Sequence, residues 1–288
     1  MPIPFTIPSH LQAYVRRVQS GTLSLHCYDA GSSDIPMLLI HGLGDEADTW
    51  QYVFPALAQK QRVIALDLPG FGRSDQPRLA YTLVFYARAV LGLLDSLGIQ
   101  HAKLVGSSMG AAVAQRLALA RPERVASLTL VDGSLPITSG PPPMALLPFL
   151  LPGVGELAYT SLRKSQDQAY ATLRPYYADL DALSDAQRAF LRERVWARVW
   201  SDGQRRAFLS SLRWMNIERA LRGSDYVRRL SQLATPTRLV WGAQDLVQPA
   251  HLADAMAAVL PNARITIIEH CGHLPQQERP DQFVSNLE

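Results

Sequence analysis

The sequence has few of the features that would indicate a membrane, secreted or metal-binding protein. Its 288 residues contain only two cysteines, Cys27 and Cys271, which are too few for a disulfide framework and lack the spacing of zinc ligands. No run of 18 apolar residues occurs, and the N-terminal segment MPIPFTIPSHLQAYVRR has no basic stretch followed by an unbroken apolar one. We therefore expect reduced cysteines, no membrane span and a cytoplasmic protein.

Clustered positive charge is also scarce. The formal net charge is +3, the pI is about 8.9, and arginine supplies nearly all the basic residues without forming a run. A nucleic-acid partner is therefore not expected. Hydrophobic residues make up 48% and charged residues 18%, which is ordinary for a globular chain long enough to bury a large core.

Short apolar segments alternate with amphipathic ones in the first half of the chain. Nearly continuous apolar runs that end in glycine or polar residues are typical of strands buried on both faces of a parallel sheet. These runs are residues 36–42, 62–70, 102–108 and 125–133. Thr82 is placed to cap a helix and Gly98 to end it. The apolar face of this helix would comprise Val84, Ala87, Leu91 and Leu94.

This βαβ alternation, which is typical of an α/β fold, stops near Ser134 and resumes far downstream. Buried strands are again expected at residues 235–245 and 263–273, with a helix from about 249 to 259 between them. The intervening segment opens with PITSGPPPMALLPFLLPG, where repeated proline forbids a long regular helix.

The domain organisation follows from this interruption. Beyond the prolines, helical patterns run over residues 185–200 and 205–220. We interpret residues 134–232 as a helical lid placed over one edge of the sheet. Residues 1–133 and 233–288 would then form a single core.

The segment LVGSSMGAA, residues 104–112, places Ser108 between two glycines where a buried strand gives way to a helix. On so tight a turn, neighbouring segments press against the residues two before and two after the serine, so side chains at Gly106 and Gly110 would clash. The hydroxyl would project at the positive end of the helix, where developing negative charge is favoured. A flexible Gly/Ser turn is the alternative, but the position after a buried strand favours a nucleophile.

Five segments together resemble the α/β-hydrolase superfamily: HGLG (41–44), DLPGFGRSD (67–75), GSSMG (106–110), WGAQD (241–245) and HCGHLPQQERP (270–280). The resemblance covers nearly the whole chain. It implies an eight-stranded, mostly parallel sheet with helices on both faces. It also implies a nucleophile on the turn, an acid after a late strand and a histidine after the last strand. Those positions are occupied here by Ser108, Asp245 and His273.

Each member of this set has a chemical role. A serine hydroxyl is a weak nucleophile, so it needs a base within hydrogen-bond reach and a carboxylate that fixes the tautomer of the base. His273 lies just past the last apolar strand and is preferred to His270, which we expect to be structural. Asp245 is preferred to Asp132, a rival acid on the preceding strand, although an aspartate at position 245 is also typical of a helix cap.

Acyl transfer also needs donors for an oxyanion, and backbone amides suit this purpose because they are fixed before charge develops. One donor should be Met109, directly after the serine, and the resemblance points to Leu43 as the other. It gives His41 a loop-shaping role, while Asp67 and Asp75 should stabilise the DLPGFGRSD turn. This chemistry requires neither a metal nor an organic cofactor.

The resemblance implies a lidded serine hydrolase. Dehalogenases and epoxide hydrolases of the superfamily carry aspartate at the elbow, so Ser108 disfavours both. We expect cleavage of a carboxylic ester, or a related acyl bond, of a small to medium apolar substrate through an acyl-enzyme. One alternative is a carbon–carbon hydrolase of ring-fission dienoates, although members of that group commonly carry tryptophan where Leu274 stands and asparagine where Gly106 stands. Another is a ligand-binding receptor on the same scaffold.

The lid carries the positive charge of the chain. Residues 134–232 contain 14 basic and 9 acidic residues, whereas the rest of the chain contains 14 and 16. Either the lid arginines attract an anionic substrate or an acidic carrier protein, or they are solvated helix faces. The large apolar side chains either line an acyl pocket or pack the lid onto the core. They are Trp196, Trp200, Phe208, Trp214 and Met215.

Overall fold

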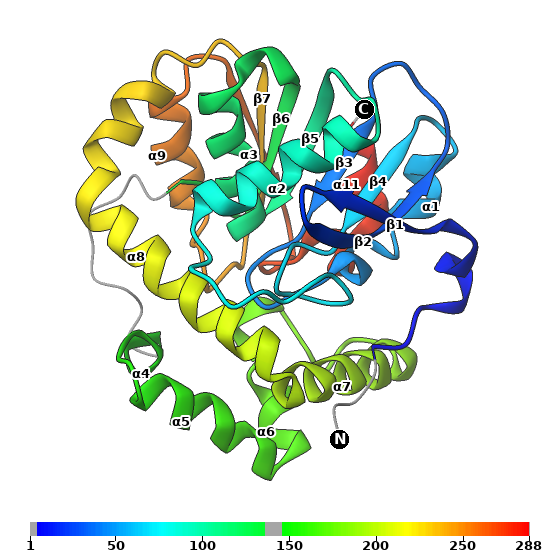
Figure 1. The fold of residues 1–288 in the computed structure, drawn as a ribbon, viewed down its shortest axis with the longest axis vertical. Helices are drawn as coiled ribbons and strands as arrows, with labels where there is room; N and C mark the ends of the chain where they lie inside the picture. The colour runs from blue at the N-terminus through cyan, green and yellow to red at the C-terminus, as the bar shows by residue number, and fades with distance from the viewer. Residues whose placement is uncertain (1–4, 136–145, 288) are drawn as a thin grey trace.

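The computed structural model describes residues 5–135 and 146–287 and has an eight-stranded sheet at its centre (Figure 1). The strand order is β1-β2-β4-β3-β5-β6-β7-β8; β1 and β2 run antiparallel to their neighbours, whereas β3 to β8 are parallel. The predicted α/β fold with a mostly parallel sheet is therefore confirmed. The strands are β1 Val15–Ser20, β2 Leu23–Ala30, β3 Met37–Ile40, β4 Val63–Leu66, β5 Ala102–Ser107, β6 Val125–Val131, β7 Thr237–Gly242 and β8 Ala263–Ile268.

Helices cover both faces of the sheet (Figure 1). On one face, α2 (Leu83–Ser96), α3 (Met109–Ala120) and α9 (His251–Val259) bury their apolar sides in one large core cluster. On the other face, α1 (Phe54–Ala58) and α11 (Pro280–Ser285) pack in a second cluster. The sheet is thus the middle layer of three.

The edge strand β8 differs from the prediction. It lies where the sequence indicates, but Arg264, Ile265 and Ile267 are exposed, so this strand is not buried on both faces. The reason is its place at the end of the sheet, since no further strand of the described residues pairs with it. The antiparallel β1–β2 pair at the opposite edge was not predicted, because its polar residues break the apolar run that marks the other strands.

The ends of helix α2 were predicted from local sequence signals, but its buried face was predicted only in part. The Thr82 hydroxyl accepts a hydrogen bond from the amide of Phe85 at 3.1 Å, as its predicted capping role requires, and Gly98 follows the helix with a φ of 68°. The buried face is displaced from the predicted one, because Val84 and Leu91 are only half-buried. The buried residues are Leu83, Tyr86, Ala87, Ala89, Val90, Leu93 and Leu94.

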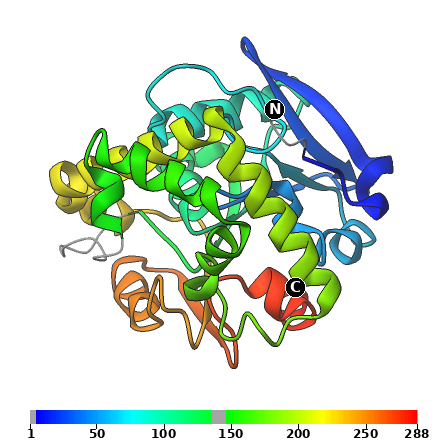
Figure 2. The ribbon, with the colours of Figure 1, turned by 90° about the horizontal axis from the view of Figure 1, so that it is seen from below.

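The chain between β6 and β7 forms the predicted helical insertion, which lies below the sheet in Figure 1 and faces the viewer in Figure 2. Helix α7 has the predicted bounds, and α8 runs on to Leu230, which is buried in the core cluster. Residues 136–145 lie outside the described residues, so the limits 134 and 232 stay a prediction. The described helices here are α4 Leu147–Leu150, α5 Val154–Ser161, α6 Gln166–Ala171, α7 Asp185–Trp200 and α8 Asp202–Leu230.

Both cysteines are free thiols buried in the core, as the composition predicts. Burial raises the pKa of the Cys27 thiol to about 12, so this group stays protonated at neutral pH. None of the described helices combines the length and the apolar composition that crossing a bilayer requires.

Candidate active site

Ser108 stands on the turn between β5 and α3 with a φ of 53° and a ψ of −116°, which is a strained conformation for a residue with a side chain. The two glycines allow other backbone segments to approach this turn closely. A Cβ on Gly106 would lie 2.3 Å from the carbonyl oxygen of Gly110, and a Cβ on Gly110 would lie 2.2 Å from that of Ile40. The steric reason for the glycine spacing is therefore visible in the structure.

Two loops meet at Ser108. A Cβ on Gly42 would lie 3.9 Å from the Ser108 Oγ, so the loop after β3 passes beside the hydroxyl. A Cβ on Gly133 would lie 2.5 Å from the Ser108 Cα, and the Ser108 amide donates to the carbonyl of Val131 at 2.8 Å. Ser108 is therefore held between the ends of β3 and β6.

His273 and Asp245 come together from the carboxyl ends of β8 and β7. The Nδ1 of His273 lies 2.7 Å from the Oδ2 of Asp245, and both side chains are buried. The Oδ1 of Asp245 accepts the amides of Val247 at 2.7 Å and Gln248 at 2.9 Å, which fixes the carboxylate. Because Nδ1 faces Asp245, Nε2 is available for proton transfer, and it has no hydrogen-bond partner in the described part of the chain. His270, the other candidate base, is exposed.

The strand order brings this pair close to Ser108. Strand β6 lies between β5 and β7, and one carboxylate oxygen of Asp132 at its end lies within 4.8 Å of an Asp245 oxygen and a His273 ring nitrogen. The next residue, Gly133, packs on the backbone of Ser108. Among the described residues, no hydrogen bond joins the Ser108 hydroxyl to His273, a contact that often tightens only when substrate binds.

Asp132, the rival acid, is also buried, and its backbone has a φ of 46°. Its Oδ1 accepts the amide of Gly242 at 2.8 Å, and its Oδ2 has no hydrogen-bond partner within the described residues. Burial and the nearby charge of Asp245 raise the pKa of Asp132 well above its usual value. Within the described residues, the His273 ring makes its hydrogen bond to Asp245 and not to Asp132.

The two predicted oxyanion donors are the amides of Leu43 and Met109. Leu43 follows Gly42 in the loop after β3, and Met109 is the first residue of α3. Neither amide donates a hydrogen bond within residues 5–135 and 146–287. The Met109 amide has no partner because the N–H groups in the first turn of a helix have no acceptor within that helix. Both amides are therefore free to donate to an oxyanion.

His41 shapes the loop that carries Leu43. Its Nε2 accepts the amide of Leu68 at 2.9 Å, and its Nδ1 lies 2.8 Å from the carbonyl of Gly42. Burial lowers the pKa of His41, so the ring stays neutral with its proton on Nδ1. Asp67 braces the neighbouring turn, because its carboxylate accepts the amide of Arg73 at 2.8 Å.

The helical insertion contacts the loop that carries His273, a feature that no residue pattern predicted. The His273 amide donates to the carbonyl of Tyr176 at 2.8 Å, and the two rings meet edge to face with centroids 5.6 Å apart. The carboxylate of Glu278 accepts the amides of Gly272 at 2.8 Å and Ala178 at 2.9 Å. No local motif marks these lid residues, because the contact arises from the way the lid folds back over the sheet.

Only part of the predicted apolar pocket reaches this region. A Cβ on Gly44 would lie 3.1 Å from the ring of Phe208, so Phe208 borders the loop after β3. Trp196 packs in a cluster within the lid. Trp200 and Trp214 are 36% and 37% exposed, so they do not line a closed pocket.

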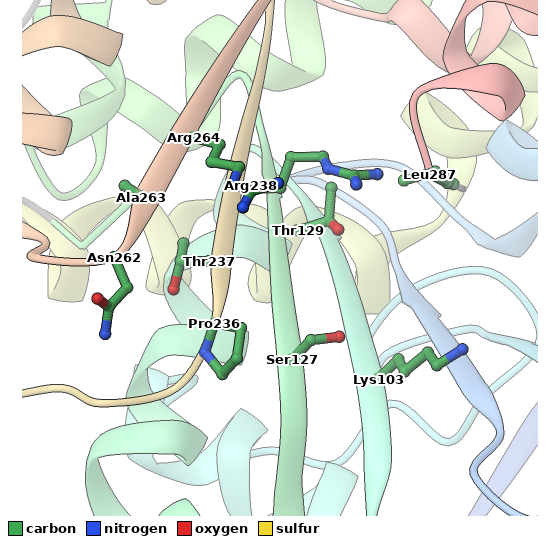
Figure 3. A pocket seen from close by; sticks show the side chains of 10 residues that line it. All are labelled: Lys103, Ser127, Thr129, Pro236, Thr237, Arg238, Asn262, Ala263, Arg264 and Leu287. Atoms are coloured by element: carbon green, nitrogen blue, oxygen red, sulfur yellow. The ribbon is translucent and has the colours of Figure 1, made fainter.

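A hollow of about 680 Å³ lies on the sheet away from this site (Figure 3). It is lined by polar and cationic side chains near the amino ends of the strands, among them Lys103, Thr237 and Arg264. Ser108 follows the carboxyl end of β5, whereas Lys103 stands near its amino end. The residues that line the hollow include no histidine, aspartate or glutamate, so it offers no general base.

Known proteins resemble this chain over most of its length. The family model described as alpha/beta hydrolase fold matches residues 35–280. A 2-hydroxy-6-oxononadienedioate/2-hydroxy-6-oxononatrienedioate hydrolase of Paraburkholderia xenovorans (strain LB400) is 30% identical over 268 residues, which cover 91% of this chain and 89% of that protein.

Solved structures of hydrolases also resemble this chain. The 2-hydroxy-6-oxo-6-phenylhexa-2,4-dienoate hydrolase of Rhodococcus sp. strain RHA1 has a TM-score of 0.78 and 25% identity, with 95% of both chains covered. A membrane phospholipase A, described as a bacterial virulence factor, has a TM-score of 0.71 and 26% identity over 95% of this chain and 84% of that one. The chain therefore belongs to the α/β-hydrolase fold family.

Proposed function

We propose that this chain is a serine hydrolase in which Ser108 attacks a carbonyl carbon, His273 transfers the proton and Asp245 orients the histidine. The observation that carries the proposal is the 2.7 Å contact between His273 Nδ1 and Asp245 Oδ2, which leaves Nε2 without a partner among the described residues. The amides of Leu43 and Met109 hold the oxyanion. Water then attacks the acyl-serine by the same route and releases the acid.

We propose that the bond cleaved is a carbon–carbon bond of a 2-hydroxy-6-oxo-dienoate. The prediction from sequence put a carboxylic ester first, but the resemblance to dienoate hydrolases over 91% and 95% of this chain supports the carbon–carbon alternative better. The proton of the C2 hydroxyl first moves to C5, which gives the 2,6-dioxo tautomer. Ser108 then attacks the 6-oxo carbon, and the C5–C6 electron pair passes through the C3–C4 double bond to the C2 oxygen, which takes up a proton. The acyl half stays on Ser108 until water releases it.

Ester hydrolysis is the second candidate, and the ion pairs of the lid favour it. A dienoate carries a carboxylate, for which a free arginine would be the natural partner. The two lid arginines that reach the loop after β3, Arg194 and Arg198, already pair with Asp48 and Glu46. An ester needs no such cation, and the likeness to a phospholipase A agrees with ester chemistry.

We take residues 134–232 as the lid. Its charge pattern favours a small-molecule substrate over an acidic carrier protein. Most of its arginines pair with nearby carboxylates. Examples are the pairs Arg163–Asp202 at 2.6 Å and Arg213–Glu156 at 2.8 Å. A displayed cationic surface for an acidic partner is therefore not supported.

Two substrate panels separate these candidates. The first contains 2-hydroxy-6-oxo-dienoates with phenyl or carboxylate tails, and the second contains p-nitrophenyl esters of increasing acyl length. Rapid turnover of dienoates that Ser108→Ala abolishes is the expected result. Serine-dependent turnover of esters alone would reverse the order of the two candidates. Stoichiometric ligand binding without product would favour a receptor, and turnover that persists in Ser108→Ala would contradict the proposed nucleophile.

A further inference from the structure

Two arginines of lid helix α7 reach across to the loop that follows β3. The Nε of Arg198 donates to Glu46 Oε2 at 2.9 Å and its Nη2 donates to Oε1 at 2.8 Å, a bidentate pair, and Nη2 also donates to Asp45. One turn earlier, the Nη2 of Arg194 lies 2.9 Å from Asp48 Oδ2. None of these five side chains is more than 14% exposed, and three of them are buried, so the cluster is a largely buried ionic contact between lid and core.

A buried cluster of this kind depends on every partner. Glu46 is fully buried, and burial raises the pKa of its carboxyl group while Arg198 opposes that rise. Removing one member of a buried ion pair leaves an uncompensated charge, which costs far more than loss of a surface pair. The bidentate geometry also fixes direction as well as distance. Arg198 and Glu46 therefore determine where this part of the loop lies.

The same loop presents the proposed oxyanion donor. Leu43 precedes Asp45 by two residues, and the Asp45 amide donates to the carbonyl of Gly42 at 3.3 Å, which closes a turn around Leu43. The lid also contacts this turn directly, because the Nε2 of Gln204 donates to the carbonyl of Gly44 at 3.4 Å. A shift of Asp45 and Glu46 would therefore also move the turn that contains the Leu43 amide.

We propose that Arg198 is a positioning residue that holds, from the lid, the Leu43 amide in the orientation that the oxyanion requires. The oxyanion hole is then complete only while α7 is docked on the core. This inference rests on the proposed serine-hydrolase function. Loss of one oxyanion donor lowers kcat by about 10²–10³-fold, and a donor that is only loosened should cost less, about 10–100-fold.

A fluorophosphonate probe tests this inference without knowledge of the substrate. The probe forms a bond between phosphorus and Ser108 Oγ, fluoride leaves, His273 takes the serine proton, and the phosphoryl oxygen occupies the oxyanion position. Labelling rate and probe affinity are measured for wild type, Arg198→Met, Arg198→Lys and Arg192→Met. Arg192 is a matched control on the same helix, because it pairs with Asp167 and its guanidinium lies over the ring of Tyr170.

The expected result is labelling about 10–100-fold slower in Arg198→Met at unchanged probe affinity, partial rescue in Arg198→Lys, and the wild-type rate in Arg192→Met. Labelling of folded Arg198→Met at the wild-type rate would overturn the inference, as would equal slowing in Arg192→Met. If Arg198→Met does not fold, Glu46→Gln takes its place, and a wild-type rate there has the same meaning. A wild type that is not labelled at Ser108 would instead overturn the serine-hydrolase function itself.

Discussion

A carboxylate oxygen of Asp132 lies within 4.8 Å of one of Asp245, although both side chains are buried. Two carboxyl groups so close together and shielded from water do not both carry a full charge. Asp245 receives hydrogen bonds from His273 and from two amides, whereas Asp132 receives one, from Gly242. Folding therefore favours the protonated form of Asp132, and it is the Asp245 carboxylate that contacts the histidine.

The two aspartates should differ sharply when each is replaced by asparagine. Asp245→Asn should lower kcat by about 10³–10⁴-fold, because an amide no longer stabilises the correct tautomer of His273. Asp132→Asn should leave kcat close to the wild-type value, because a neutral group replaces a neutral group. Both variants are compared by steady-state turnover of the best substrate from the panels. The reverse pattern would make Asp132 the acid.

The proton on Asp132 also predicts a pH dependence of stability. Its pKa is raised in the folded state by burial and by the charges of Asp245 and Glu278, so folding favours the protonated form. This contribution is present below the ordinary pKa of 3.8 and is lost as pH rises through the folded-state value.

Asp132→Asn, which cannot ionise, should therefore gain stability relative to wild type as pH increases. The difference in the free energy of unfolding should grow by up to about 1.4 kcal/mol per pH unit within that window. Urea unfolding at a series of pH values from acidic to neutral measures it. A difference that stays constant with pH would show that Asp132 does not retain its proton.

Local sequence signals account for much of the sheet and for the nucleophile turn. The apolar runs mark β3 to β8, and Gly106 and Gly110 mark a turn that excludes side chains, so short-range sterics are sufficient. The order of Ser108, Asp245 and His273 followed from family resemblance. Sequence reasoning also placed Asp245 ahead of Asp132. The contact that supports this choice, between Asp245 Oδ2 and His273 Nδ1, is a tertiary one that no local pattern encodes.

The contacts between lid and core could not be predicted. Arg198 and Glu46 are 152 positions apart, and neither has a neighbourhood that differs from that of a solvated charge. Tyr176 likewise reaches His273 only because the lid folds back over the sheet. Such pairings depend on tertiary geometry, whereas periodicity and capping signals depend on neighbours along the chain.

Glu278 should couple the lid to the base. In Glu278→Gln, one oxygen can accept the amide of Gly272 or that of Ala178, and the new NH₂ group faces the other N–H. A buried donor left without an acceptor costs about 1–3 kcal/mol, and the His273 loop should loosen with it. The matched control is Glu269→Gln, because Glu269 is exposed. The midpoint of thermal unfolding and kcat should both fall in Glu278→Gln. Changes of equal size in Glu278→Gln and Glu269→Gln would contradict the coupling.

The last prediction separates close packing from backbone strain at two glycines. A Cβ on Gly110 would lie 2.2 Å from the Ile40 carbonyl oxygen, so Gly110→Ala must move a central strand or the elbow and should cost about 3 kcal/mol of unfolding free energy. Gly153 has a φ of 81° and no atom within 4 Å of its Cβ position, so Gly153→Ala should cost only about 1 kcal/mol. Because the elbow orients Ser108, Gly110→Ala should also slow fluorophosphonate labelling, whereas Gly153→Ala should not. Equal losses of stability, measured by denaturant unfolding, would contradict close approach as the reason for the glycine at position 110.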